Sequence, residues 1–371
     1  MKCFDWKGSD DPRDIVHIVV QNLVEGQLAV LPAETAYHVV ASALKPTAVE
    51  HLHALSTGNR RPYLLLRSSE ESLDYSPKLS RIAERVIRRG WPGPLILELE
   101  SFQPESLACQ LPPTVQDRIR VDGRFLPQRV AAHEAIVHAM RLLPGPLVAL
   151  PLLDTFGNPV CTPEVANEVA QTAAVALIDD GPTHYGDLAT AIRIENQNCS
   201  MQSPGVVDLE NLQRLSQFIV LLVCTGNTCR SPMAEVLMRH ALERRFGTAN
   251  FSVVSAGLSA FPGGAASPEA IAVMAQRNLN LRSHQSKSIT ERVVKFADLI
   301  LTMTNSHRRA IVERMPDTVS RLHLVSGTGQ DVSDPFGGNE SIYADCADQI
   351  EQYINGWVNQ IDETWIAHWD S

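Results

Sequence analysis

An apolar run that leads directly into a loop with a cysteine and an arginine constrains this chain more than any other feature. Residues 219–223 are Ile-Val-Leu-Leu-Val, and they precede Cys224, five further residues and Arg230. The apolar run predicts a buried strand, and the good helix formers that follow the loop predict a helix. A strand end beside a helix start directs backbone N–H groups at one point. The loop therefore predicts an anion site, with Cys224 as a nucleophile and Arg230 as a two-point phosphate clamp.

The residues around the loop decide between this interpretation and a chance pair of cysteine and arginine. Ser231 is expected to cap the helix, with Pro232 in its first turn. Gly226 is expected to supply a positive φ, and the side chain of Asn227 is expected to hold the turn. The alternative is a buried structural cysteine, which would leave Arg230 as an unfavourable cation at a helix N-terminus.

Residues 219 to about 365 resemble the low-molecular-weight phosphotyrosine phosphatase family. The resemblance rests on the loop and its flanks, on Ser255-Ala256-Gly257, on His284 and on the motif Asp334-Pro335. It implies an α/β fold of the Rossmann-like kind, with a parallel sheet flanked by helices. The expected strands are 218–223, 251–255, 298–303 and 321–325, and the expected helices are 232–246, 267–278, 290–296, 305–314 and 340–362.

The resemblance also implies the catalytic roles. Cys224 is the nucleophile, and the loop N–H groups together with Arg230 favour its thiolate form. Asp334 protonates the leaving group and later activates the water that hydrolyses the phosphocysteine. The reaction so implied needs no metal and no cofactor. The expected phosphate-binding residues are Thr225, Gly226, Asn227, Thr228, Cys229 and Ser231.

Four residues are expected to support the nucleophile rather than to react. By the resemblance, Ser231 donates a hydrogen bond to the sulfur of Cys224, and Ser255 and His284 support the loop. Two roles remain open for Cys229. It forms a reversible disulfide with Cys224, which would protect the nucleophile from irreversible oxidation, or it is a small packing residue.

Two positions bear on the substrate. Tyrosine-directed members carry an isoleucine before the second loop cysteine and two tyrosines after the acid motif, whereas this chain has Thr228 and Phe336-Gly337-Gly338. Both differences resemble the protein-arginine phosphatase branch. A threonine hydroxyl accepts a hydrogen bond from a guanidinium N–H, which isoleucine would leave unpaired at a cost of about 1–3 kcal/mol. The expected substrate is a phosphorylated protein carrying phosphoarginine or, if Thr228 is a tolerated near-isostere, phosphotyrosine.

The remaining composition predicts a two-domain cytoplasmic protein. The chain has 371 residues, which is long for one domain, and we expect a first domain over 1–211 and a second over 217–371. It has no apolar stretch long enough to cross a membrane and no secretory signal at its start. Seven scattered cysteines do not make a disulfide framework. The net charge of −10 argues against nucleic-acid binding.

Residues 1–211 resemble the YrdC/Sua5 family of threonylcarbamoyl-adenylate synthases, which begin the t6A modification of tRNA. The motifs that carry the resemblance are Leu31–His38, Trp91-Pro-Gly-Pro-Leu95, Gly145–Ala149, Asp180-Gly-Pro182 and Val206-Val-Asp208. It implies an open twisted α/β sheet with a large, positively lined cavity.

Several polar groups that this family uses to hold ATP, magnesium and threonine are missing. Ala33 and His38 replace a threonine and a glycine, Pro151-Leu-Leu153 replaces Ser-Ala-Asn, and Pro204-Gly205 replaces Ser-Thr. We therefore expect a degenerate ligand-binding or regulatory module. The alternative is a bifunctional protein that still makes L-threonylcarbamoyladenylate with ATP and Mg²⁺, or binds a tRNA-linked nucleotide. The retained candidates for a ligand site are Glu34, Thr35, Tyr37, Arg61 and Arg120.

Overall fold

The structure, a computed structural model, describes residues 1–56, 61–247 and 250–369. The chain divides into two compact units, the first over Met1–Leu215 and the second over Ser216–Ala367. The terminal strand β15 (His368–Trp369) belongs to the first unit, although the sequence analysis assigned those residues to the second domain. Among the described residues, no helix combines the length and the apolar character needed to cross a membrane.

The first unit is built on a mixed eleven-stranded sheet. Its strands β1, β8 and β2 run parallel, and β2 then pairs antiparallel with β3. β15 adds to the last position beside β10, where Asn198 aligns with His368. In sheet order the strands are β1 (Lys2–Asp5), β8 (Ala176–Asp179), β2 (Ala29–Pro32), β3 (Tyr37–Ser42), β7 (Leu147–Pro151), β4 (Tyr63–Leu65), β6 (Phe125–Arg129), β5 (Leu95–Glu100), β9 (Thr190–Glu195), β10 (Asn198–Ser203) and β15.

Apolar residues at helical spacing bury two helices against this sheet. Val16 and Val19 of α1 and Ala135 and Met140 of α6 lie in one core cluster with β2, β3, β7 and β8. The expected α/β sheet domain is confirmed. The helices of this unit are α1 (Pro12–Val24), α2 (Pro46–Ala54), α3 (Ser72–Tyr75), α4 (Arg81–Gly90), α5 (Pro113–Ile119), α6 (Glu134–Leu142), α7 (Pro163–Ala170) and α8 (Leu209–Ser216), the last of which ends at the start of the second unit.

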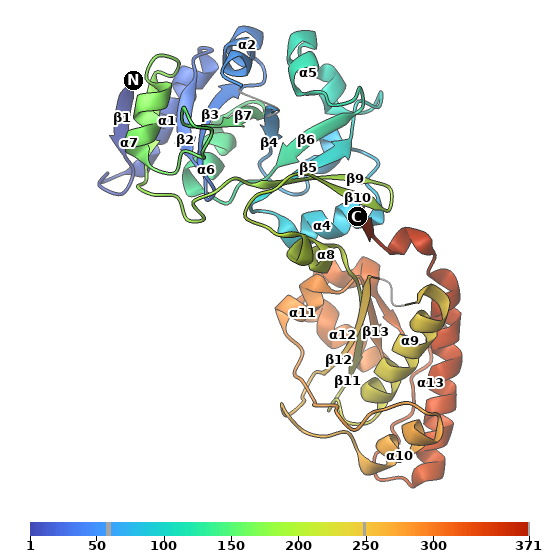
Figure 1. The fold of residues 1–371 in the computed structure, drawn as a ribbon. Helices are drawn as coiled ribbons and strands as arrows, with labels where there is room; N and C mark the ends of the chain where they lie inside the picture. The colour runs from blue at the N-terminus through green and yellow to red at the C-terminus, as the bar shows by residue number, and fades with distance from the viewer. Residues whose placement is uncertain (57–60, 248–249, 370–371) are drawn as a thin grey trace. The chain divides into compact units, whose positions relative to one another are not determined.

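The second unit is a four-stranded parallel sheet in the order β12-β11-β13-β14, with helices on both faces. Alternate residues of β11 point to opposite faces. Val220, Leu222 and Cys224 lie in the core with α9, α10 and α13, whereas Leu221 and Val223 pack toward α11 and α12. Figure 1 shows these two helix layers on either side of the strands. Because both faces are covered, β11 is apolar throughout.

The elements of the second unit agree with the sequence expectations to within a few residues. The strands are β11 (Phe218–Cys224), β12 (Phe251–Gly257), β13 (Leu299–Thr302) and β14 (Leu322–Leu324), and the helices are α9 (Arg230–Phe246), α10 (Pro268–Gln276), α11 (Glu291–Phe296), α12 (Asn305–Arg314) and α13 (Glu340–Gln360). The Rossmann-like parallel-sheet class is confirmed.

Two local expectations in the loop between β11 and α9 are wrong. The helix begins at Arg230 with Cys229 at the N-cap, so Ser231 lies inside the first turn and does not cap it. The positive φ is at Asn227, which has φ 55°, and not at Gly226. Asparagine adopts this left-handed conformation more readily than most residues because its short polar side chain hydrogen-bonds locally.

Candidate active site

The loop from Cys224 to Arg230 forms a nest of backbone donors at the carboxyl end of β11. The N–H groups of Thr225, Gly226 and Thr228 make no hydrogen bond to any other described residue. The first turn of α9 adds further N–H groups without partners inside the helix. This arrangement suits an anion with several oxygens, such as a phosphoryl group.

The sulfur of Cys224 lies at the base of this nest and has two polar neighbours. The side-chain oxygen of Ser231 is 2.9 Å from Sγ, and the backbone N–H of Asn227 donates to Sγ at 3.2 Å. Because Ser231 Oγ accepts a hydrogen bond from Asn227 Nδ2 at 2.9 Å, its own proton is free to point at the sulfur. These two contacts fix the position of the sulfur beneath the loop N–H groups.

Asn227 holds the loop through contacts to three separate segments. Its Nδ2 also donates to Ser255 Oγ at 2.9 Å, and Ser255 in turn donates to Glu235 on α9 at 2.6 Å. Its Oδ1 accepts from the backbone N–H of Lys287, and its carbonyl accepts from His284 Nε2 at 2.9 Å. The structure thus brings both expected supports, Ser255 and His284, to the loop.

Gly257 lets the end of β12 approach the loop closely. A Cβ at this position would lie 2.5 Å from the carbonyl oxygen of Thr225 and 3.0 Å from the backbone nitrogen of Asn227. Such contacts are too short for any side chain, so glycine is required here for packing. The Ser-Ala-Gly segment therefore supports the loop with both its serine and its glycine.

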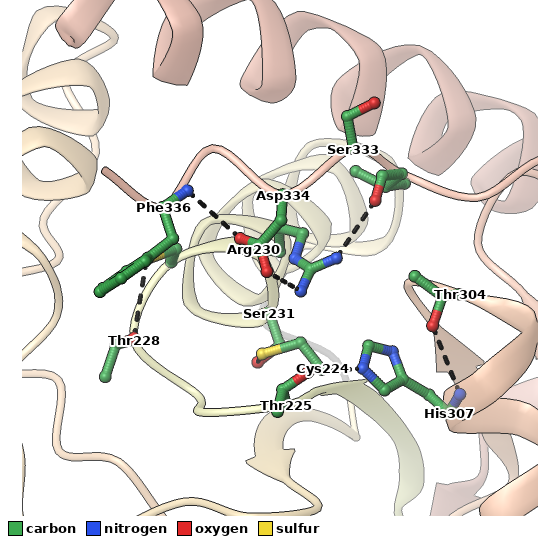
Figure 2. Close-up of polar contacts among 12 residues, drawn as sticks. Cys224, Thr225, Thr228, Arg230, Ser231, Thr304, His307, Ser333, Asp334 and Phe336 are labelled. Atoms are coloured by element: carbon green, nitrogen blue, oxygen red, sulfur yellow. Dashed lines mark hydrogen bonds and ion pairs between the residues drawn. The ribbon is translucent and has the colours of Figure 1, made fainter. Parts of the chain in front are cut away.

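The guanidinium of Arg230 is buried and faces the acid motif. Its Nη2 donates to Asp334 Oδ2 at 2.5 Å, and its Nη1 donates to the carbonyl of Val332 at 3.2 Å (Figure 2). The side chain of Asp334 is 52% exposed, whereas that of Arg230 is 6% exposed. The carboxylate can move into solvent while the arginine stays fixed, so an incoming phosphoryl group can replace it on the guanidinium.

Cys229 is buried and packs against α13. Its sulfur lies 3.2 Å from the hydroxyl of Tyr343 and 3.6 Å from that of Thr228. Burial and the contact with Cys229 raise the pKa of Tyr343 to about 12. All described cysteines are free thiols in the structure, so Cys229 packs against α13 here, and its reversible disulfide with Cys224 stays a prediction.

His307 is a site residue that the sequence analysis missed. It lies on α12, and its Nε2 is 2.8 Å from the hydroxyl of Thr225. Burial, together with the charge of Arg230, lowers the pKa of His307 to about 4. The contact joins residues 82 positions apart in the chain, so no local pattern could have indicated it.

In the first unit the candidate ligand residues do not gather at one place. Glu34 is buried in an ion pair with Arg129, at 2.7 Å, and Thr35 accepts from the same arginine at 3.1 Å. Tyr37 donates to the carbonyl of Gly181 at 2.7 Å. The arginine beside the first motif is therefore Arg129, which the sequence analysis did not single out.

The other two candidates lie elsewhere in that unit. Arg120 follows α5, donates to Gln116 at 2.6 Å and stacks on the ring of Phe102 at 4.1 Å. Arg61 lines a cavity of about 250 Å³ together with His38 and Pro151. Of these two arginines, Arg61 is the one that lies where it can contact a ligand in that cavity.

The described residues that line the cavity beside Arg61 carry balanced rather than positive charge, which differs from the expectation. Arg193 lies in its wall, but both Glu98, at 2.8 Å, and Asp122, at 2.7 Å, pair with it. Burial and the charge of Arg129 lower the pKa of His38, also in the wall, to about 3, so this imidazole is neutral. Among the described wall residues, Arg61 is the charged side chain outside these ion pairs.

No group of metal-binding side chains occurs within residues 1–56, 61–247 and 250–369.

Comparison with known proteins agrees with the geometry of the second unit. The family model for low molecular weight phosphotyrosine protein phosphatase matches residues 219–366. The chain is 40% identical over 146 residues to a protein-arginine-phosphatase of Bacillus subtilis. This alignment covers 38% of this chain and 95% of that relative. It is 36% identical over 143 residues to the probable low molecular weight protein-tyrosine-phosphatase EpsP of Ralstonia solanacearum, covering 38% and 94%. The chain belongs to the low molecular weight phosphotyrosine protein phosphatase family.

Two further comparisons concern a solved structure similar to the second unit and a family model that matches the first unit. A solved structure of a YwlE mutant from Bacillus subtilis is 35% identical in sequence, with a TM-score of 0.37. The superposition covers 39% of this chain and 98% of the YwlE chain. In the first unit, the Sua5/YciO/YrdC family model, described as "Telomere recombination", matches residues 21–202. The protein is a cysteine-dependent phosphatase joined to a module similar to that second family.

Proposed function

We propose that the second unit hydrolyses phosphoarginine on proteins through a phosphocysteine on Cys224. The thiolate attacks phosphorus, the P–N bond breaks, and Asp334 gives its proton to the leaving guanidine nitrogen. Water then attacks the phosphocysteine and the S–P bond breaks. Asp334 takes the proton of the water, phosphate leaves and the thiolate is restored. Throughout, Arg230 and the loop N–H groups hold the phosphoryl oxygens.

The observation that carries the choice of phosphoarginine is the free hydroxyl of Thr228. Its one polar contact within the described part of the chain is a long one, 3.6 Å to the sulfur of Cys229, so the oxygen can accept a hydrogen bond from a substrate. A guanidinium offers such a donor beside the transferred phosphorus, whereas a phenol ring offers an apolar edge. The similarity to a relative named as a protein-arginine-phosphatase supports the same substrate.

The test is a change of substrate preference in Thr228→Ile. The substitution keeps the β-branched shape and removes the acceptor. We expect kcat/KM for a phosphoarginine peptide to fall about ten-fold or more, which corresponds to about 1.4 kcal/mol, and that for a phosphotyrosine peptide to rise. Thr228→Val is the matched control, because it removes the hydroxyl at nearly constant volume and should lower the phosphoarginine value in the same way.

Two results would replace this proposal with a tyrosine phosphatase. One is a wild-type preference for the phosphotyrosine peptide. The other is an equal loss on both peptides in Thr228→Ile, which would mean that the hydroxyl does not distinguish the leaving groups.

We propose that the first unit is a ligand-binding or regulatory module that makes no L-threonylcarbamoyladenylate. The balanced charges around Arg193 and the apolar segment at Pro151 support this, because a triphosphate needs uncompensated cations. A tRNA-linked nucleotide remains a candidate ligand at Arg61. We further place the protein in the cytoplasm, where reducing conditions keep the thiol of Cys224 free and phosphorylated proteins are accessible.

A further inference from the structure

The imidazole of His307 occupies a buried position behind the first residue of the phosphate loop. α12 begins after Thr304, whose side-chain oxygen accepts from the backbone N–H of His307 at 3.3 Å. This cap places His307 in the first turn of the helix, where it is 5% exposed. Figure 2 shows its contact with Thr225 on the side of Cys224 away from Thr228.

Thr225 is the residue whose position this contact controls. It follows the nucleophile directly, and two bonds fix it: its carbonyl accepts from the backbone N–H of Ser259 at 2.9 Å, and its hydroxyl meets His307 Nε2 at 2.8 Å. Its own N–H and that of Gly226 have no partner among the described residues. The two bonds therefore set the direction in which these two donors point.

The histidine carries a cost that a packing residue would avoid. Its Nδ1 is buried and has no hydrogen-bond partner in the described part of the chain. An unsatisfied buried polar atom costs about 1–3 kcal/mol, whereas leucine would fill a similar volume without it. Because its pKa is lowered to about 4, the imidazole stays neutral near pH 7 and adds no second cation beside Arg230.

We propose that His307 is a positioning residue of the phosphatase, which holds the hydroxyl of Thr225 and so aims the first loop N–H groups at the transferred phosphoryl group. This inference rests on the phosphatase activity proposed for the second unit. It holds equally for phosphoarginine and for phosphotyrosine as the substrate. Loop donors bind the charge of the transition state more strongly than the bound ester, so their misplacement lowers kcat more than it raises KM.

The first experiment compares three variants of the full chain on para-nitrophenyl phosphate. His307→Leu removes both nitrogens, and we expect kcat to fall about ten-fold or more with little change in KM. His307→Gln places an amide near the position of Nε2 and should recover most of the loss, whereas His307→Asn places its amide near Nδ1 and should not. His240→Leu, on the exposed part of α9, controls for the loss of a histidine.

The second experiment is a double-mutant cycle with Thr225→Val, which removes only the hydroxyl partner. We expect His307→Leu and Thr225→Val to have equal effects that do not add in the double variant, and Thr225→Ser to retain more activity than Thr225→Val.

The outcomes separate this inference from the function on which it rests. Absence of turnover in the wild type would overturn the phosphatase assignment itself. An active wild type with additive effects, equal loss in His307→Gln and His307→Asn, or a lower Tm with unchanged kcat would overturn the positioning role alone.

Discussion

Each unit contains a buried cluster of polar residues, and the two clusters differ in whether their groups have free hydrogen-bonding capacity. Around Cys224, the side chains hold one another while the N–H groups of Thr225 and Gly226 stay without partners. Around Glu34, both carboxylate oxygens are taken, one by Arg129 and the other by the N–H of Ala132. Since buried donors and acceptors are normally satisfied, the free donors identify the reactive centre and the satisfied cluster identifies a structural one.

The two buried arginines show the same difference. Arg230 pairs with Asp334, which is half exposed and can leave. Arg129 is 0% exposed and its partner Glu34 is 10% exposed, so this pair is enclosed far more than the pair of Arg230 and Asp334. One ion pair is therefore exchangeable, and the other is part of the fold.

The largest expected effect comes from removing the sulfur in the reactive centre. In Cys224→Ser, turnover of any phosphate ester should fall about ten thousand-fold or more, because the serine hydroxyl is not ionised near neutral pH. Phosphate binding should persist, since the loop donors and Arg230 remain. Steady-state kinetics and calorimetric titration of inorganic phosphate measure the two quantities, and substantial turnover would refute the nucleophile assignment.

In the first unit, breaking the buried pair should affect stability and leave catalysis intact. Glu34→Gln leaves the buried charge of Arg129 without a counter-ion, and we expect the free energy of unfolding of this unit to fall by about 3 kcal/mol. Urea denaturation measures it. The control is Glu210→Gln, which breaks an exposed pair with Arg214 and should cost less than about 0.5 kcal/mol. A change in phosphatase kcat in Glu34→Gln would contradict the separation of the two centres.

A smaller effect is expected from His38, the buried neutral histidine of the first unit. Its pKa lies near 3 in the folded protein against 6.5 for a free histidine, so the unfolded chain takes up the proton first as pH falls. Its contribution to stability is complete above pH 6.5 and is lost between there and pH 3. From pH 7 to pH 4.5 the wild type should lose about 2 kcal/mol more than His38→Asn does. Equal pH dependence in the two proteins would show that His38 does not titrate this way.

The sequence predicted the elements of the second unit because its hydrophobic patterns are local. The unbroken apolar run of β11 and the helix-forming residues that follow the loop are readable within a few residues. The nucleophile and the clamp are six positions apart, so their meeting in one loop was also predictable.

Contacts between distant segments could not be predicted in the same way. His307 reaches Thr225 across five intervening elements, α9, β12, α10, α11 and β13. Arg129 reaches Glu34 because the loop after β2 lies against the end of β6. Ser231 looked like a helix cap since serine has that preference, but its hydroxyl is held by Asn227 and faces the sulfur of Cys224. In each case tertiary hydrogen bonds outweigh the local preference.

The most direct test of the division between the two units is a parallel assay of one preparation of the full chain. Phosphate release is measured with a phosphoarginine peptide, and pyrophosphate release with ATP, threonine and bicarbonate, beside an active threonylcarbamoyl-adenylate synthase as positive control. We predict phosphate release that disappears in Cys224→Ser, and no pyrophosphate above background. Pyrophosphate release that depends on threonine and is lost in Arg61→Ala would contradict the account, because it would place a working synthase site in the first unit.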